Sequence, residues 1–341
     1  YASTRFMGKA AGGNSSNFHL LEAITGQSEN LSNQSPDLSS LSSLSFNSNL
    51  QHVKNVWAGT YKLIGNANMV ITYVPDIFMD ETRKTQILGE AYFLRAWAYF
   101  NAVRIWGDIP LLTSPVGTGS PDFYAERTSQ SIVYDQIVSD LKFSEGSGLA
   151  FIDQSGRVSI AAVKSLLSKV YLTMAGHPLN KTEHYADAAE KAKEVIDNGG
   201  LSLFNTYGEI FLESNENKQE HIFSIQYAPN VSANYESLSF LPAKNITKGG
   251  AVGWQTNLPE TNFYNSFESG DKRKNNRQGW FYTDYFVGGN GELTDLGGPH
   301  IFKAFNVANF GSDTVEGNGQ GDFLNFSVIR FAEVLLIYAE A

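Results

Sequence analysis

The feature that most constrains the fold is a stripe of apolar residues between about Asp80 and Trp106. Its members recur at steps of four and three residues: Ile87, Ala91, Leu94, Ala98, Ala102 and Ile105. This period is typical of a helix that buries one face. The alanines within the stripe leave room for a neighbouring helix to approach closely. Gly107 and Pro110 end the pattern, which therefore predicts one long, buried helix.

Five other stretches have a helical pattern. They span about residues 55–74, 128–143, 159–175, 185–198 and 326–341. Pro75 stops the first of them, and Ser159 is a suitable N-cap for the helix that Gly176 ends. Serine and asparagine dominate residues 27–49, which is typical of loop or irregular structure.

Residues 200–325 show little helical period. Within them, residues 221–227 alternate in the manner of a half-buried strand, with Ile222 and Ser224 opposite Phe223 and Ile225. A structureless loop of such length is rare in a compact domain. We therefore predict one irregular lobe that packs against the helices.

The helices pair in a recognisable way. Small and aromatic positions alternate in the helices at about residues 80–106 and 159–175, as in the second helix of a tetratricopeptide unit. Such units bury their faces only by stacking. The predicted fold class is mainly α, with tetratricopeptide-like helical hairpins and an irregular, loop-rich lobe that contains short strands. We expect a single domain over residues 1–341, with hairpins at about 55–199 and 326–341 and the lobe at about 200–325.

Charge and composition disfavour several classes of function. The formal net charge is −10 and the pI is about 5.1, so the chain repels nucleic acid and anionic lipid. The basic run Lys272, Arg273 and Lys274 follows Asp271 in a polar segment and is interpreted as a solvated turn. The chain has no cysteine, which rules out disulfides, thiolate metal sites and cysteine nucleophiles. No stretch approaches the roughly 18 apolar residues of a membrane-spanning helix.

Three segments carry a resemblance to a known family. They read GEAYFLRAWAYF with WGDIPL at residues 89–100 and 106–111, GRVSIAAVKSLLSKVYL at 156–172, and IRFAEVLLIYAEA at 329–341. Weaker similarity lies at residues 220–227 and 267–273. In order and spacing, the chain resembles the SusD/RagB family of outer-membrane nutrient-binding lipoproteins over nearly its whole length. Members usually start with a lipidated cysteine and continue beyond the Ala-Glu-Ala motif, so we expect both ends to be missing here.

The motifs of common catalysts and metal sites are absent from the sequence. It has no Gly-x-Ser-x-Gly elbow, no His-Glu-x-x-His helix and no phosphate loop. The six histidines have no ligand spacing, and Asp313, Glu316 and Asp322 do not follow the calcium-loop pattern. No catalytic residue, metal or cofactor is predicted.

A glycosidase remains an alternative, because the separation of two catalytic carboxylates depends on the fold. Glu90 and Glu333 lie in helical stripes beside Arg95 and Arg330. This setting favours structural ion pairs between stacked hairpins. An enzyme is therefore the weaker interpretation.

Sugar binding requires aromatic platforms flanked by polar side chains, because a pyranose has a flat apolar face and a rim of hydroxyls. In the lobe, Trp254 with Asn257, and Trp280 with Tyr282 and Tyr285, meet this requirement. If residues 280–282 are extended, the Trp280 and Tyr282 rings share one side. Trp57, Trp97 and Trp106 lie on helical patterns and are predicted to be core.

The resemblance adds a location and a role. It implies that glycan binds on the face away from the hairpin stack, between loop residues before the first long helix and the lobe. Asn47 and His52 represent the first of these regions, which has no tryptophan to suit a starch-like site. The resemblance implies a cell-surface oligosaccharide- or polysaccharide-binding protein at the outer membrane that serves a TonB-dependent, SusC-like transporter without catalysis. Alternatives are a member that binds peptide or another nutrient, a helical-repeat adaptor, and the glycosidase.

Overall fold

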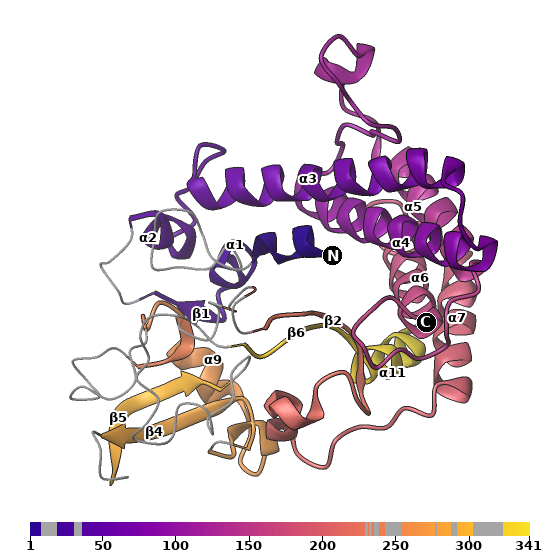
Figure 1. Cartoon of the computed structure of the whole chain (residues 1–341). Helices are drawn as coiled ribbons and strands as arrows, with labels where there is room; N and C mark the ends of the chain where they lie inside the picture. The colour runs from indigo at the N-terminus through magenta and orange to yellow at the C-terminus, as the bar shows by residue number, and fades with distance from the viewer. Residues whose placement is uncertain are drawn as a thin grey trace.

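The computed structural model describes residues 1–7, 19–30, 36–228, 231, 234, 239–242, 254–276, 278–287, 292–302 and 323–341. Its long helices are α3 (Gln51–Tyr73), α4 (Glu81–Trp106), α5 (Gln130–Glu145), α6 (Ile160–Ala175), α7 (His184–Asn198) and α11 (Phe331–Glu340). Each contacts the next along the chain, so that they form one stack of hairpins at one side of the molecule (Figure 1). The predicted mainly α fold is confirmed.

The central helix of the stack, α4, begins and ends as its sequence predicts. The Asp80 carboxylate accepts a hydrogen bond from the Arg83 amide and so caps the first turn. Gly107 ends the helix with a φ of 70°, a conformation that suits glycine. Phe93, Tyr99 and Phe100 are almost completely buried, and Trp97 is only 7% exposed, as expected for core residues. Trp57 and Trp106 are partly buried and pack against each other, with ring centroids 4.9 Å apart.

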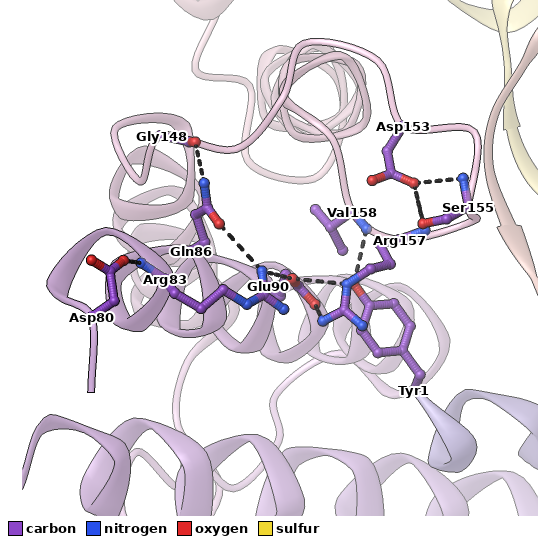
Figure 2. A network of polar contacts seen from close by, with 10 residues as sticks. All are labelled: Tyr1, Asp80, Arg83, Gln86, Glu90, Gly148, Asp153, Ser155, Arg157 and Val158. Atoms are coloured by element: carbon purple, nitrogen blue, oxygen red, sulfur yellow. Dashed lines mark hydrogen bonds and ion pairs between the residues drawn. The ribbon is translucent and has the colours of Figure 1, made fainter. Parts of the chain in front are cut away.

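Glu90 and Glu333 are structural, but their partners are not the arginines beside them in the sequence. Figure 2 shows the Glu90 carboxylate between Arg83 and Arg157, with the Tyr1 ring alongside. Arg157 Nε donates to Glu90 at 3.1 Å. Glu333 pairs with Lys169. Arg95 points away from Glu90, because helical residues five apart lie on different faces, and it pairs with Asp140 instead. Arg330 is the last residue of a strand that precedes α11, and it pairs with Glu220.

Two strands tie the lobe to the stack. β2 (His221–Ile225) and β6 (Phe326–Arg330) pair in antiparallel fashion, although about a hundred residues separate them. The sequence predicted a helix from residue 326; the first five of these residues form a strand instead. All five residues of β2 are buried, so the prediction of a half-buried strand is also corrected. Phe223 of β2 packs against Phe93 of α4, with ring centroids 5.0 Å apart.

The lobe contains short elements around a second hydrophobic core. Its strands are β1 (Ser28–Glu29), β3 (Leu258–Pro259), β4 (Phe281–Val287) and β5 (Glu292–Ile301), which pair as β1 with β3 and β4 with β5. Its helices include α9 (Thr261–Ser266). The lobe core consists of Ile210, Phe211, Phe240, Leu241, Trp254, Tyr282, Phe302 and Leu324.

The N-terminal part of the chain is more regular than expected. α1 (His19–Glu22) and α2 (Pro36–Ser42) precede α3, and α2 and β1 lie in the segment that was predicted to be irregular. Short 3-10 helices complete the fold: η1 (Ala2–Met7), η2 (Ala23–Thr25), η3 (Val74–Asp76), η4 (Pro121–Tyr124), η5 (Tyr207–Phe211), η6 (Glu213–Asn215) and η7 (Lys272–Lys274). Within the described ranges, every helix is too short or too polar to cross a bilayer.

Candidate functional site

The most accessible tryptophan of the lobe is Trp280, which immediately precedes β4. It is half-buried and its ring lies among three other side chains. The ring centroids of Tyr207 and Phe267 are 5.8 and 5.9 Å away. The Arg273 guanidinium carbon lies 5.5 Å from the Trp280 ring centroid and 4.6 Å from that of Phe267. The arginine therefore holds two aromatic rings through cation–π contacts.

The segment that supplies these side chains is shaped by two caps. The Glu260 carboxylate accepts a hydrogen bond from the Phe263 amide and starts α9. The Asp271 carboxylate accepts the Arg273 amide at 2.9 Å and its guanidinium at 2.9 and 3.1 Å. These bonds from Arg273 lower the pKa of Asp271 to about 2. The ionised pair fixes the direction of the arginine.

Two hollows adjoin this aromatic group. An open one of about 640 Å³ is lined by Phe263, Ser266, Phe267, Glu268, Ser269, Gly270, Asp271 and Arg273. A small one of about 50 Å³ is lined by Glu22, Gln27, Ser28, Pro259, Phe263, Trp280, Phe281 and Ile301. The N-terminal segment reaches the site because the Glu260 amide donates to the Gln27 carbonyl at 2.9 Å beside the β1–β3 pair. Aromatic walls with hydroxyl, amide and charged groups can accept a sugar ring.

Most of the residues predicted for the site lie beneath the surface. Trp254 is 8% exposed and Tyr282 1%; both belong to the lobe core, and the Tyr282 hydroxyl donates to the Phe240 carbonyl at 2.6 Å. Asn257 is 3% exposed. Neither Trp254 nor Tyr282 offers a ring face to solvent. Tyr285 lies on β4, and its side chain is outside the described part.

The N-terminal pair of predicted residues lies around the start of α3. Asn47 is exposed, and its side-chain oxygen accepts the Asn49 amide at 2.8 Å. His52 is 3% exposed, and this burial lowers its pKa. In Figure 1 the start of α3 and the β4–β5 pair lie on the same side of the molecule, away from α7 and α11.

Four contributors to the aromatic group were not predicted from the sequence: Tyr207, Phe263, Phe267 and Arg273. The Lys272–Lys274 turn is largely exposed, as predicted, but the Arg273 side chain also covers Phe267 and Trp280. The alternation of acidic, basic and aromatic residues at positions 263–280 was the available signal. The chain at Thr283 and Asp284 continues as β4, with a shift in register between Tyr282 and Asp284.

Two buried polar atoms lie near the site without partners in the described structure. They are Asn257 Oδ1 and His300 Nε2. His300 is 3% exposed, its ring centroid is 5.3 Å from that of Tyr282, and burial lowers its pKa to about 4. In the described ranges no three histidine or acidic residues gather as a metal site. Asp313, Glu316 and Asp322, considered for calcium, lie outside those ranges.

Known proteins resemble the chain in sequence and in fold. A family described as "Starch-binding associating with outer membrane" matches residues 4–172. SusD-like protein P2 of Formosa agariphila is 28% identical over 311 residues, which cover 85% of this chain and 58% of that protein. The chain spans little more than half the length of such curated relatives.

Solved structures share the fold over the whole chain. A SusD superfamily protein from Parabacteroides distasonis has a TM-score of 0.91 at 32% identity, covering 99% of this chain and 72% of that one. A laminarin-binding SusD-like protein has a TM-score of 0.80 at 24% identity, covering 100% of this chain and 77% of that one.

A hairpin stack with an irregular lobe is thus the fold of SusD-like proteins. The chain belongs to the SusD superfamily.

Proposed function

We propose that the protein captures oligosaccharide or polysaccharide at the outer-membrane surface and passes it intact to a TonB-dependent, SusC-like transporter. The observation that carries this proposal is the half-buried Trp280 ring, which packs against Arg273 and Phe267, two residues that line an open hollow. Partly exposed aromatic rings suit the apolar face of a pyranose. Asp271 and Arg273 neutralise each other, which favours an uncharged glycan.

The other predicted contacts have subordinate roles in this proposal. Trp254, Asn257 and Tyr282 are buried and support the lobe from within. Tyr285 remains a predicted ligand contact. Asn47 is exposed just before α3 and remains a predicted contact, whereas the buried His52 supports the start of that helix from within. A structure described with xylogluco-oligosaccharide and a laminarin-binding protein share the fold, which supports glycan as the ligand class.

Binding without hydrolysis fits the acidic groups of the site. A general acid must hold a proton near neutral pH. Asp271 has a pKa of about 2 because it is bonded to Arg273, so it is ionised and already occupied. This argues against the carboxylate pair that a glycosidase requires.

The first test replaces Trp280 with alanine and measures affinity for laminarin and xyloglucan oligosaccharides by calorimetry, after a glycan array has identified a ligand. An aromatic binding contact contributes on the order of 1–3 kcal/mol, so we expect a roughly ten- to hundredfold loss of affinity. The melting temperature should change little, because Trp280 is only half-buried.

Trp97→Ala is the matched control, since Trp97 is 7% exposed in the hairpin core. We expect it to cost roughly 3–5 kcal/mol of folding free energy through the cavity it leaves. An equal fall in melting temperature for both variants would place Trp280 in the lobe core and refute the site. Shortened products that disappear with one carboxylate change would favour the glycosidase, and affinity for peptides alone would favour the peptide-binding alternative.

A further inference from the structure

The segment after α4 leaves the helical stack as a projecting loop, residues 110–127, which we call the finger. Figure 1 shows it at the top of the view, beyond α3, with η4 at its end. An antiparallel bridge closes its base: Ile109 and Thr128 exchange hydrogen bonds of 3.2 and 2.9 Å between their main chains. Ile109 is completely buried. The WGDIPL motif is therefore the entry to the finger.

A buried ion pair lies directly below this base. The Arg95 guanidinium is 3% exposed and donates to both oxygens of Asp140, at 2.8 and 2.7 Å. Its remaining donor Nη1 bonds the Asn68 side-chain oxygen at 2.8 Å and the Thr113 carbonyl at 3.0 Å. A buried pair of this kind contributes little net stability but specifies one geometry. Here that geometry is the path of the finger.

Two further side chains complete the attachment. The Asn68 amide nitrogen donates to the carbonyls of Leu112 and Ser114, at 2.9 and 3.1 Å. The Tyr99 hydroxyl donates to the Leu112 carbonyl and accepts its amide, at 2.8 and 2.6 Å. Because a satisfied polar network is rigid, the base of the finger is held like a part of the core. An incidental surface loop does not need such an attachment.

The end of the finger presents aromatic rings to solvent. Phe123 is 52% exposed and Tyr124 88% exposed, and the two rings meet edge to face at 5.0 Å. Ser120 caps η4 and so fixes their direction. Asp122 and Glu126 are exposed beside them. Exposed aromatic residues on a rigid support are typical anchors of protein interfaces.

We propose that the finger is a docking element that inserts Phe123 and Tyr124 into an apolar cleft of a partner protein. Its convex shape is wrong for a small ligand, because ligand sites are concave. The exposed carboxylates of Asp122 and Glu126 outnumber the single positive charge of Arg127 and favour a basic rim on the partner. The assignment rests on the proposed function, because the partner is the TonB-dependent transporter to which the glycan is delivered.

The test measures binding of the purified transporter in detergent to the wild type and to the double variant Phe123→Ser, Tyr124→Ser. We expect the variant to lose at least tenfold in affinity, with an unchanged melting temperature and unchanged glycan affinity. Phe78→Ser is the matched control, because Phe78 is a fully exposed aromatic residue on a different turn. The Phe78→Ser variant should bind the transporter with the same affinity as the wild type.

A charge variant tests the predicted rim. Asp122→Lys should lower the rate of association with the transporter. The association rate of this variant should also depend less on salt concentration than that of the wild type. Equal transporter affinity of the wild type and the double variant would overturn the docking role alone. Absence of any transporter binding by the wild type would overturn the delivery function and this assignment with it. Binding to phosphatidylglycerol vesicles that the double variant loses, with transporter binding retained, would identify a membrane contact and also overturn the proposal.

Discussion

At the scale of single residues, the lobe contains a buried histidine whose protonation state depends on whether the lobe is folded. His300 on β5 is 3% exposed, and its Nδ1 lies 3.3 Å from the Gly298 carbonyl. Its Nε2 has no partner in the described structure. Burial disfavours the charged imidazolium and lowers the His300 pKa from 6.5 to about 4. The folded lobe therefore needs this histidine to be neutral.

This pKa predicts acid sensitivity of the lobe. Below pH 6.5 the unfolded chain binds a proton at His300, and the folded chain does so only near pH 4. Stability from this group is complete above pH 6.5 and falls as the pH decreases toward 4, by on the order of 3 kcal/mol at most. We expect His300→Phe to flatten the fall of melting temperature between pH 7 and 4.5. His177→Gln, at an exposed histidine, should leave the slope unchanged; an unchanged slope in His300→Phe would contradict the prediction.

From the sequence, aromatic side chains were correctly expected in the candidate site, but several of the particular residues named for it are buried. The same prediction was made for Trp254 and Trp280, because polar residues lie near both, and Trp280 is the one that is partly exposed. Trp254 and Tyr282 have similar neighbours but are buried, because residues distant in the chain, such as Phe240 and Phe302, cover them. Contacts of this kind, between residues distant in the chain, cannot be predicted from the local sequence. For the same reason the stacking of Arg273 on Trp280 was not foreseen.

At the scale of elements, the long helices were predictable because an α-helix forms its hydrogen bonds within one segment. α6 begins after Ser159, whose hydroxyl accepts the Ala162 amide at 3.2 Å, as the sequence indicated. β6 was mistaken for helix because its partner β2 is remote in the sequence, and tertiary pairing outweighs local period. Helical period can be read from neighbouring residues, whereas the pairing of two strands depends on residues that are distant in the sequence.

Close packing of α4 on the segment after α5 gives a prediction that opposes helix propensity. In a solvent-exposed helix, replacing glycine with alanine stabilises the helix by roughly 1 kcal/mol. A Cβ at Gly89, however, would lie 2.1 Å from Ser147 Oγ and 2.4 Å from Ser147 Cβ. Ser147 is 2% exposed and donates to the Ser144 carbonyl at 2.6 Å, so it cannot swing into solvent. We expect Gly89→Ala to lower the free energy of unfolding by about 1–3 kcal/mol.

Chemical denaturation of a double-mutant cycle checks this explanation. Ser147→Gly should restore much of the stability lost in Gly89→Ala, since it removes the atoms that clash. Gly65→Ala on α3 is the control, because a Cβ there meets nothing within 4 Å. That variant should be as stable as the wild type or more so. Stabilisation by Gly89→Ala itself would show that the segment around Ser147 moves away from α4 at little cost.

At the scale of the whole molecule, the question is whether the stack and the lobe fold as one unit. β2 and β6 lie between them (Figure 1), and β2 contributes Phe223 to the core of the stack. The Phe223 ring centroid is 5.0 Å from that of Phe93 and 6.5 Å from that of Trp97. On the other side, His221 of β2 lies 3.2 Å from the Ile210 carbonyl of the lobe. One strand thus packs against both parts.

These contacts predict a single cooperative domain over residues 1–341, in which damage at β2 destabilises both parts together. Phe223→Ala removes a ring that is 2% exposed, and we expect it to cost roughly 3–5 kcal/mol. Calorimetry should give one unfolding transition at a lower temperature. Hydrogen exchange should accelerate equally in α4 and in β4, because both then open through the same global unfolding. If the stack and the lobe were separate domains, the variant would instead show two transitions, with β4 protected as in the wild type.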